Sequence, residues 1–200
     1  MFPNNINNLI ENFKKLPGIG QKSAERLAFS VLKNFDSDDY DDFSNSLISV
    51  RDDTKYCSIC NVISETDVCN ICSDNSRNHE LLIVVENSKD VFSIEKLGNF
   101  NGYYHVLDGL ISPFDDITPD DINLESLFDR VKNDKIKELI FVTRSGVEAD
   151  TTILYIKKML EDFDIVISRV ANGIPIGADM DYIDTLTLES ALNNRKQVLD

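Results

Sequence analysis

The sequence lacks any apolar run long enough to span a membrane, because no window in its 200 residues approaches the roughly 18 apolar residues that a transmembrane helix needs. Its first 20 residues also lack the basic flank and apolar stretch of a secretory signal peptide. We therefore expect a soluble, cytoplasmic protein with no membrane partner. Apolar residues are nevertheless common, and 42% hydrophobic residues are enough for one or two compact domains with a buried core.

Basic residues are scarce as well. The chain has 20 Lys and Arg against 35 Asp and Glu, which gives a net charge of -15. This balance excludes a surface that is basic all over, so any site for nucleic acid has to be local. Five aspartates fall within residues 36–42, and we interpret this acidic segment as a solvated face or link.

The first 55 residues are predicted to be helical. Apolar residues recur every three or four positions over residues 5–16 and again over residues 24–35, with a weaker stripe over residues 43–50. A proline and two glycines in residues 17–20 separate the first two stripes. The pattern predicts a helix, a tight turn and a second helix.

The turn of this predicted hairpin suits the binding of phosphate. Gly18 and Gly20 let the backbone come close to a phosphate, while the next helix presents its free N–H groups. Lys22 and Arg26 lie four residues apart on one helix face, where they can neutralise neighbouring phosphates. A plain connection between two packed helices with two solvated cations explains the same spacing. The segment LPGIG followed by Lys and Arg resembles the helix-hairpin-helix DNA-binding motif.

All four cysteines lie within 16 residues, in two Cys-x2-Cys pairs formed by Cys57, Cys60, Cys69 and Cys72. Two such pairs can close a tetrahedral site of four thiolates with no open position, which is typical of structural zinc. Two disulfides would conflict with a cytoplasmic chain, and a thioredoxin-like redox pair would leave one pair unused. We predict one structural Zn²⁺, which stabilises a segment too short and polar to fold alone.

Strands and helices alternate after residue 80. Near-continuous apolar runs at residues 81–86, 103–107, 138–143 and 164–170 predict four buried strands, with helical stripes between them. This order predicts an α/β region with a mostly parallel sheet covered by helices. In such folds the ligands bind at the C-terminal ends of the strands.

Acidic residues follow two of these strands. Glu86 ends the first strand, and Glu148 and Asp150 follow the third. Carboxylates in these places can hold Mg²⁺ for phosphoryl transfer. Acids favoured at a helix N-terminus, or acids in ion pairs, give the same pattern, so the spacing alone leaves both interpretations open.

The whole chain resembles the RecR family of recombination mediator proteins. The segments similar to that family run nearly end to end: LPGIGQKSAERLAF, CSICNVISETDVCNIC, YYHVLDGLISP, EADTTILYI and SRVANGIPIGADMDY. The resemblance implies an α+β chain of several parts. These are a helix-hairpin-helix region (1–55), a four-cysteine zinc finger (56–76), an α/β Toprim domain with a mostly parallel four-stranded sheet (79–173), and a C-terminal segment with a helix (174–200).

The same resemblance implies a function in recombinational DNA repair. Proteins of this kind form a ring-like homo-oligomer, a tetramer, that clamps gapped DNA or junctions between single and double strands. They act with RecO, and sometimes RecF, to load RecA onto single strands coated by SSB. The resemblance implies DNA contacts at Gly18, Gly20, Lys22 and Arg26. The sequence has no Gly-x4-Gly-Lys-Ser/Thr loop, so we expect no ATP binding by this chain alone.

Toprim domains of primases and topoisomerases carry a Glu at the first strand and an Asp-x-Asp at a later strand end. Glu86 matches that Glu, but Arg144 and Gly146 stand at the two Asp positions. A lone carboxylate gives Mg²⁺ little support, so we predict a non-enzymatic protein, with a metal-dependent nuclease or primase-like enzyme as the alternative. We expect Arg144 to pair with Glu148, or else to meet DNA or a partner. Partner binding is the predicted role of Glu86, Arg144, Glu148 and Asp150.

Overall fold

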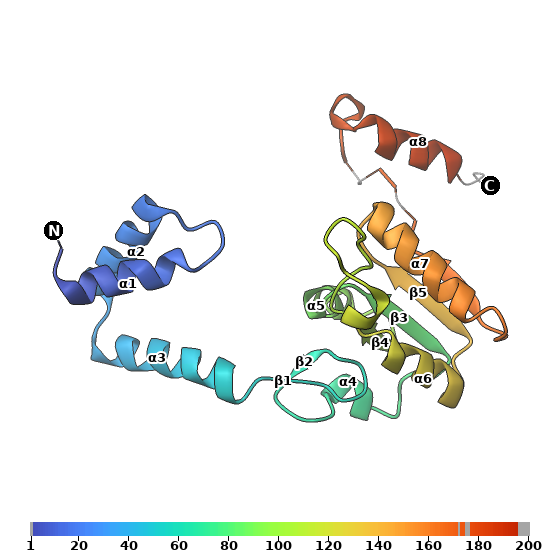
Figure 1. The fold of residues 1–200 in the computed structure, drawn as a ribbon, viewed down its shortest axis with the longest axis horizontal. Coiled ribbons are helices and arrows are strands. Elements are labelled where there is room, and N and C mark those ends of the chain that lie inside the picture. Colours follow the sequence, from blue (N-terminus) through green and yellow to red (C-terminus); the bar gives the residue numbers. More distant parts are fainter. Residues whose placement is uncertain (1, 172, 175–176, 196–200) are drawn as a thin grey trace. The chain divides into compact units, whose positions relative to one another are not determined.

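The computed structural model describes residues 2–171, 173–174 and 177–195 (Figure 1). The chain folds as two compact units, residues 1–54 and residues 55–200, which are described separately below. Within the described ranges, no helix combines the length and the apolar character that a membrane crossing requires.

The first unit consists of three helices, α1 (Asn4–Lys14), α2 (Gln21–Asn34) and α3 (Ser37–Asp52). The first two pack against each other through the buried residues Ile6, Ile10, Ala24 and Ala28. Two alanines on α2 leave room for a close helix contact, and the predicted helix, turn and helix are confirmed. The α3 helix begins with a capping box, in which the Asp36 side chain accepts a hydrogen bond from the Asp39 backbone at 3.0 Å. The acidic segment is exposed, as expected for a solvated face.

The second unit begins with the cysteine-rich segment and continues into the sheet. The cysteine-rich segment contains the antiparallel strands β1 (Lys55–Tyr56) and β2 (Ile63–Ser64) and the short helix α4 (Asn70–Ser73). The elements that follow are β3 (Leu81–Val85), α5 (Ser88–Glu95), β4 (Tyr103–Val106), η1 (Pro119–Asp121), α6 (Glu125–Asn133), β5 (Glu138–Val142), α7 (Val147–Met159), β6 (Val166–Arg169), η2 (Met180–Tyr182) and α8 (Thr185–Asn193).

Strands β3 to β6 form one parallel sheet in the order β4-β3-β5-β6 (Figure 1). The predicted four-stranded sheet is confirmed, and all its pairings are parallel. Successive residues of a strand point to opposite faces. Leu82 and Val84 therefore join the core with α6 and α7, while Ile83 and Val85 face α5 and the cysteine-rich segment. Burial on both faces explains why these strands are apolar throughout.

The outer edge of β4 is covered. The Val106 backbone N–H donates to the Cys60 carbonyl at 2.9 Å, and Arg130 Nη1 donates to the Tyr104 carbonyl at 2.7 Å. The cysteine-rich segment and the α6 side chain thus satisfy backbone groups that an edge strand would otherwise present to solvent.

The C-terminal ends of β3 and β5 form a switch point in the topology. The two strands are neighbours, yet the chain leaves β3 toward β4 and leaves β5 toward β6. Loops that diverge in this way leave a crevice at the strand ends, the usual ligand position in open α/β sheets. Glu86 follows β3 at this point, and Arg144 follows β5.

Candidate metal centre and nucleic-acid interface

The four cysteine sulfurs converge on one point. All four lie within 4.8 Å of one another, and the Sγ atoms of Cys60 and Cys69 are 3.6 Å apart. A tetrahedral zinc ion with Zn–S bonds of about 2.3 Å holds its sulfurs roughly 3.8 Å apart, so this cluster has the size that zinc requires. The four thiols form no disulfide with one another. The donor set is the one expected for a structural Zn²⁺.

Backbone N–H groups around the cluster favour the thiolate form. The Cys69 N–H donates to Cys57 Sγ at 3.3 Å, and the Cys72 N–H donates to Cys69 Sγ at 3.4 Å. Directly after Cys60 the chain turns sharply through Asn61, whose φ of 60° lies in the left-handed region that asparagine tolerates.

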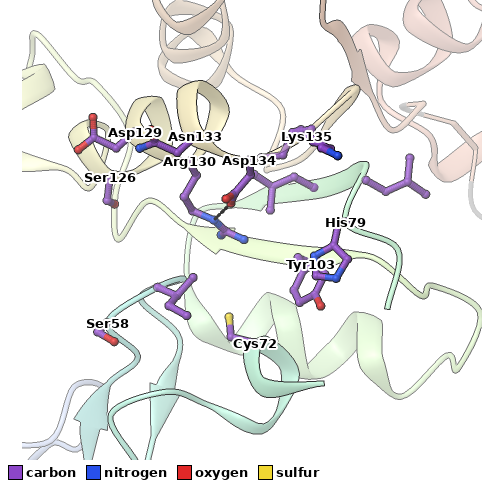
Figure 2. A pocket seen from close by; sticks show the side chains of 14 residues that line it. Ser58, Cys72, His79, Tyr103, Ser126, Asp129, Arg130, Asn133, Asp134 and Lys135 are labelled. Atoms are coloured by element: carbon purple, nitrogen blue, oxygen red, sulfur yellow. Dashed lines mark ion pairs between the residues drawn. The ribbon is translucent and has the colours of Figure 1, made fainter. Parts of the chain in front are cut away.

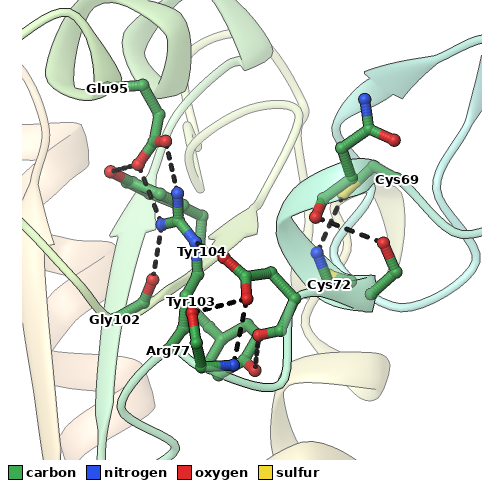
Figure 3. A network of polar contacts seen from close by, with 11 residues as sticks. Cys69, Cys72, Arg77, Glu95, Gly102, Tyr103 and Tyr104 are labelled. Atoms are coloured by element: carbon green, nitrogen blue, oxygen red, sulfur yellow. Dashed lines mark hydrogen bonds and ion pairs between the residues drawn. The ribbon is translucent and has the colours of Figure 1, made fainter. Parts of the chain in front are cut away.

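An arginine that the sequence analysis did not single out joins the cysteine-rich segment to the sheet (Figure 3). Arg77 makes a two-pronged ion pair with Glu95 of α5, at 2.5 Å and 3.0 Å, and also donates to the Gly102 carbonyl at 3.0 Å. The Tyr104 hydroxyl donates to Glu95 Oε1 at 2.5 Å. The guanidinium of Arg77 lowers the pKa of Glu95, and burial together with Glu95 raises the pKa of Tyr104. Because eighteen residues separate the ion-paired partners, no local sequence pattern predicts this pair.

The helical hairpin presents its turn without obstruction from its own unit. Gly18 has a φ of 79°, which favours glycine. Gly20 precedes α2 in an extended conformation, and a Cβ atom there would meet no atom within 4 Å. The missing side chain at Gly20 is therefore not required by the packing around it. It leaves the backbone N–H groups at the start of α2 open to a phosphate.

The hairpin is also the locally basic part of an acidic chain. Residues 1–34 contain five Lys or Arg and two Glu, a net charge of +3, against -15 for the whole protein. Lys22 and Arg26 are both exposed, and neither forms an ion pair with any residue that the structure describes. The geometry brings Gly18, Gly20, Lys22 and Arg26 to one hairpin, as the spacing predicts.

At the switch point, two arginines neutralise two of the four predicted residues. Arg144 Nε lies 3.3 Å from Glu86 Oε2, and Arg169 Nη1 lies 2.5 Å from Asp150 Oδ1. The prediction that Arg144 pairs with Glu148 is wrong. The parallel register sets Val85 opposite Val142, which brings the residues after these two strands together. Glu148 lies instead in the acidic first turn of α7, where the helix dipole favours it.

Glu86 and Arg144 both line a cavity of about 310 Å³. Its other lining residues are Asn87, Asp90, Ser93, Ile94, Val142 and Thr143. In the described part of the chain, only the four cysteines form a group of three or more ligands placed to hold a metal. The residues at the switch point do not fit the Mg²⁺ of a Toprim enzyme, because the cation nearest Glu86 is the Arg144 guanidinium.

Comparisons with known proteins match successive stretches of the chain. Family models for the RecR helix-hairpin-helix, the RecR zinc finger domain of four cysteines, the Toprim domain and the RecR C-terminal region match residues 6–50, 54–74, 80–171 and 173–196. The chain is also 42% identical over 197 residues to "Recombination protein RecR" of Staphylococcus aureus (strain Newman), which covers 98% of this chain and 99% of the relative. With the cysteine geometry, the match at residues 54–74 confirms the predicted structural zinc site.

Proposed function

The chain belongs to the RecR family, and from this premise we propose that it is a cytoplasmic, non-enzymatic mediator of recombinational DNA repair that clamps gapped DNA or strand junctions. It acts with RecO, and in some settings RecF, to load RecA onto single strands coated by SSB. Near end-to-end similarity to a recombination protein supports the mediator role. The observation that carries the DNA contact is the open, locally basic turn between α1 and α2 on a strongly acidic chain.

Phosphate contacts at the hairpin are expected to make DNA binding sensitive to salt. Each neutralised phosphate releases counterions, so the double substitution Lys22→Ala, Arg26→Ala lowers the affinity and flattens the slope of log K against log salt by about two units. The measurement is fluorescence anisotropy of a labelled gapped duplex with zinc-loaded protein, titrated with salt from about 50 mM upward.

The matched control for this test is Lys157→Ala, Lys158→Ala, which removes the same charge from two exposed residues of α7. It should leave the slope within experimental error of the unchanged protein. Equal slopes for both double variants would remove the hairpin from the DNA site.

A clamp requires several copies, and we propose a ring-like homo-oligomer, a tetramer. The support is an apolar surface on the first unit. No residue of α3 is buried within that unit, although the helix carries large apolar side chains. The exposed large apolar residues on α2 and α3 are Phe29, Leu32, Tyr40, Phe43, Leu47, Ile48 and Val50. A surface of this kind is typical of one that a second copy covers.

The charged edge at the C-terminal ends of the strands is our proposed binding surface for RecO or RecF. Glu86, Arg144, Glu148 and Asp150 all lie there, on or next to the switch point. Arg144 is 59% exposed while it pairs with Glu86. Charged groups of both signs that stay accessible are suited to recognising a partner by complementary charge.

The same edge is the reason for proposing that the protein is not a nuclease or a primase-like enzyme. Divalent metals at phosphoryl-transfer sites need several carboxylate oxygens, and here arginines are paired with Glu86 and Asp150. End-labelled gapped DNA incubated with Mg²⁺ or Mn²⁺ should therefore give no products on a denaturing gel. A ladder of products that disappears in Glu86→Gln would establish the enzymatic alternative.

A further inference from the structure

A cavity of about 760 Å³ in the second unit lies between the cysteine-rich segment, the sheet and α6 (Figure 2). It reaches one zinc ligand. Cys72 lines the cavity wall together with Ile59, Tyr103, Arg130 and Asn133, among others. The other three cysteines do not line it.

The exposure of the four cysteines follows the same division. Cys57, Cys60 and Cys69 are buried, with 3%, 0% and 5% of their surface exposed. Cys72 is half-buried. A small molecule in the cavity therefore meets the sulfur of Cys72 before it meets any other ligand of the cluster.

Hydrogen bonding separates Cys72 from Cys57 and Cys69 in a second, independent way. Backbone N–H groups of Cys69 and Cys72 donate to the sulfurs of Cys57 and Cys69. Within the described ranges, no backbone N–H donates to the Cys72 sulfur. A thiolate without such donors keeps more of its charge and is the stronger nucleophile.

We propose that Cys72 is an oxidation site in the zinc-loaded finger, attacked through this cavity by hydrogen peroxide and small hydroperoxides. The Cys72 thiolate attacks one peroxide oxygen; an S–O bond forms, the O–O bond breaks and hydroxide leaves. The sulfur is oxidised by two electrons to the sulfenic acid, and the peroxide is reduced. A second thiolate of the cluster, within 4.8 Å, attacks the sulfenic sulfur, forms a disulfide and releases another hydroxide. The cluster then lacks two of the thiolates that hold the metal.

Arg130 is placed to assist this step. Its side chain is only 11% exposed and lines the cavity, where the guanidinium is held by the Tyr104 carbonyl at 2.7 Å and by Asp134 Oδ2 at 3.8 Å. Figure 2 shows the guanidinium and the Cys72 sulfur facing the same space. A positive charge fixed there stabilises the hydroxide that leaves the peroxide.

The test treats zinc-loaded full-length protein with hydrogen peroxide and measures two quantities. A reagent that labels sulfenic acids traps the first oxidised cysteine, which mass spectrometry then identifies. A chromogenic chelator measures the rate of zinc release. We expect the first label at Cys72. The rim variant Asn133→Trp, which narrows the cavity, should slow zinc release by at least about fivefold, because access limits the reactivity of a thiolate.

Lys132→Trp is the matched control, since it places the same side chain one residue away on α6 without lining the cavity. It should release zinc at the rate of the unchanged protein. First labelling at Cys57, Cys60 or Cys69, or equal rates for the two tryptophan variants, would overturn the proposal. The labelling is measured on the unchanged protein, so its result does not depend on how well either variant folds.

Discussion

Replacing Cys57 with serine is expected to abolish stoichiometric zinc binding and to destabilise the second unit by more than about 5 kcal/mol, because zinc contributes roughly 10–16 kcal/mol in finger peptides. Cys57 is one of the buried ligands, at 3% exposure, and a serine hydroxyl is a poor substitute for a thiolate. The loss extends beyond the finger, since three of the cysteines belong to the core cluster that includes Ile83 and Val85 of the sheet.

Elemental analysis of the purified protein and urea unfolding followed by circular dichroism measure this effect. The unchanged protein should contain one zinc per chain, and Cys57→Ser much less. Asn75→Ser, an exposed substitution in the same segment, serves as the control and should keep both the zinc and the unfolding midpoint. A Cys57→Ser protein with one zinc and an unchanged midpoint would refute the closed four-thiolate site.

The second large effect is expected at Arg77. Its side chain is 13% exposed and that of Glu95 is 27% exposed. Arg77→Met therefore leaves the Glu95 carboxylate and the Gly102 carbonyl without their guanidinium partner. Breaking a largely buried pair from one side is costly, and we expect a loss of about 2–4 kcal/mol in the free energy of unfolding.

Lys137→Met provides a matched comparison. Lys137 pairs with Glu80 at 2.6 Å, but the two side chains are 68% and 48% exposed. Removing this surface pair should cost less than about 1 kcal/mol. Adding Glu95→Leu to Arg77→Met should recover part of the stability, because it removes the unpaired Glu95 carboxylate; the recovery is partial because the Tyr104 hydroxyl then loses its acceptor. Equal losses for Arg77→Met and Lys137→Met in urea unfolding would show that Arg77 does not anchor the finger.

The Arg77 effect should also depend on pH. Arg77 lowers the pKa of Glu95 below its ordinary value near 4.5. The contribution of the pair is therefore complete above that value and is lost as the pH falls through the lower folded pKa. The stability difference between the unchanged protein and Arg77→Met should narrow in this acidic range. Zinc loss in acid affects both proteins and is removed by the comparison.

Local sequence patterns were sufficient to predict the helices, the strands and the metal ligands. The helical stripes, the apolar strands and the two Cys-x2-Cys pairs each depend on neighbours a few residues apart, and each is found where the sequence predicts it. The error at Arg144 has the opposite cause. Glu148 is its neighbour in sequence, but the parallel pairing of β3 with β5 makes Glu86 its neighbour in space.

Arg77 and the cavity beside Cys72 show a second limit of sequence reasoning. The Arg77 pair spans 18 residues and joins two parts that the sequence analysis treats separately. The cavity takes its walls from the finger, the sheet and α6. Spacing showed which cysteines bind zinc, but the packing of the finger on β4 decides which of them a small molecule can reach.

The covered edge of β4 limits how copies of this sheet can join. Its outer Val106 N–H is already bonded to Cys60, whereas β6 is the opposite edge strand of the sheet. A sheet with two open edges can add strands without end and grow into a fibre. With the β4 edge closed, β6 is the one edge left for pairing among the residues that the structure describes, and pairing between two β6 strands stops at two copies. The zinc finger therefore prevents growth of the sheet at β4. A chain that loses its finger has a second open edge, and that edge favours aggregation.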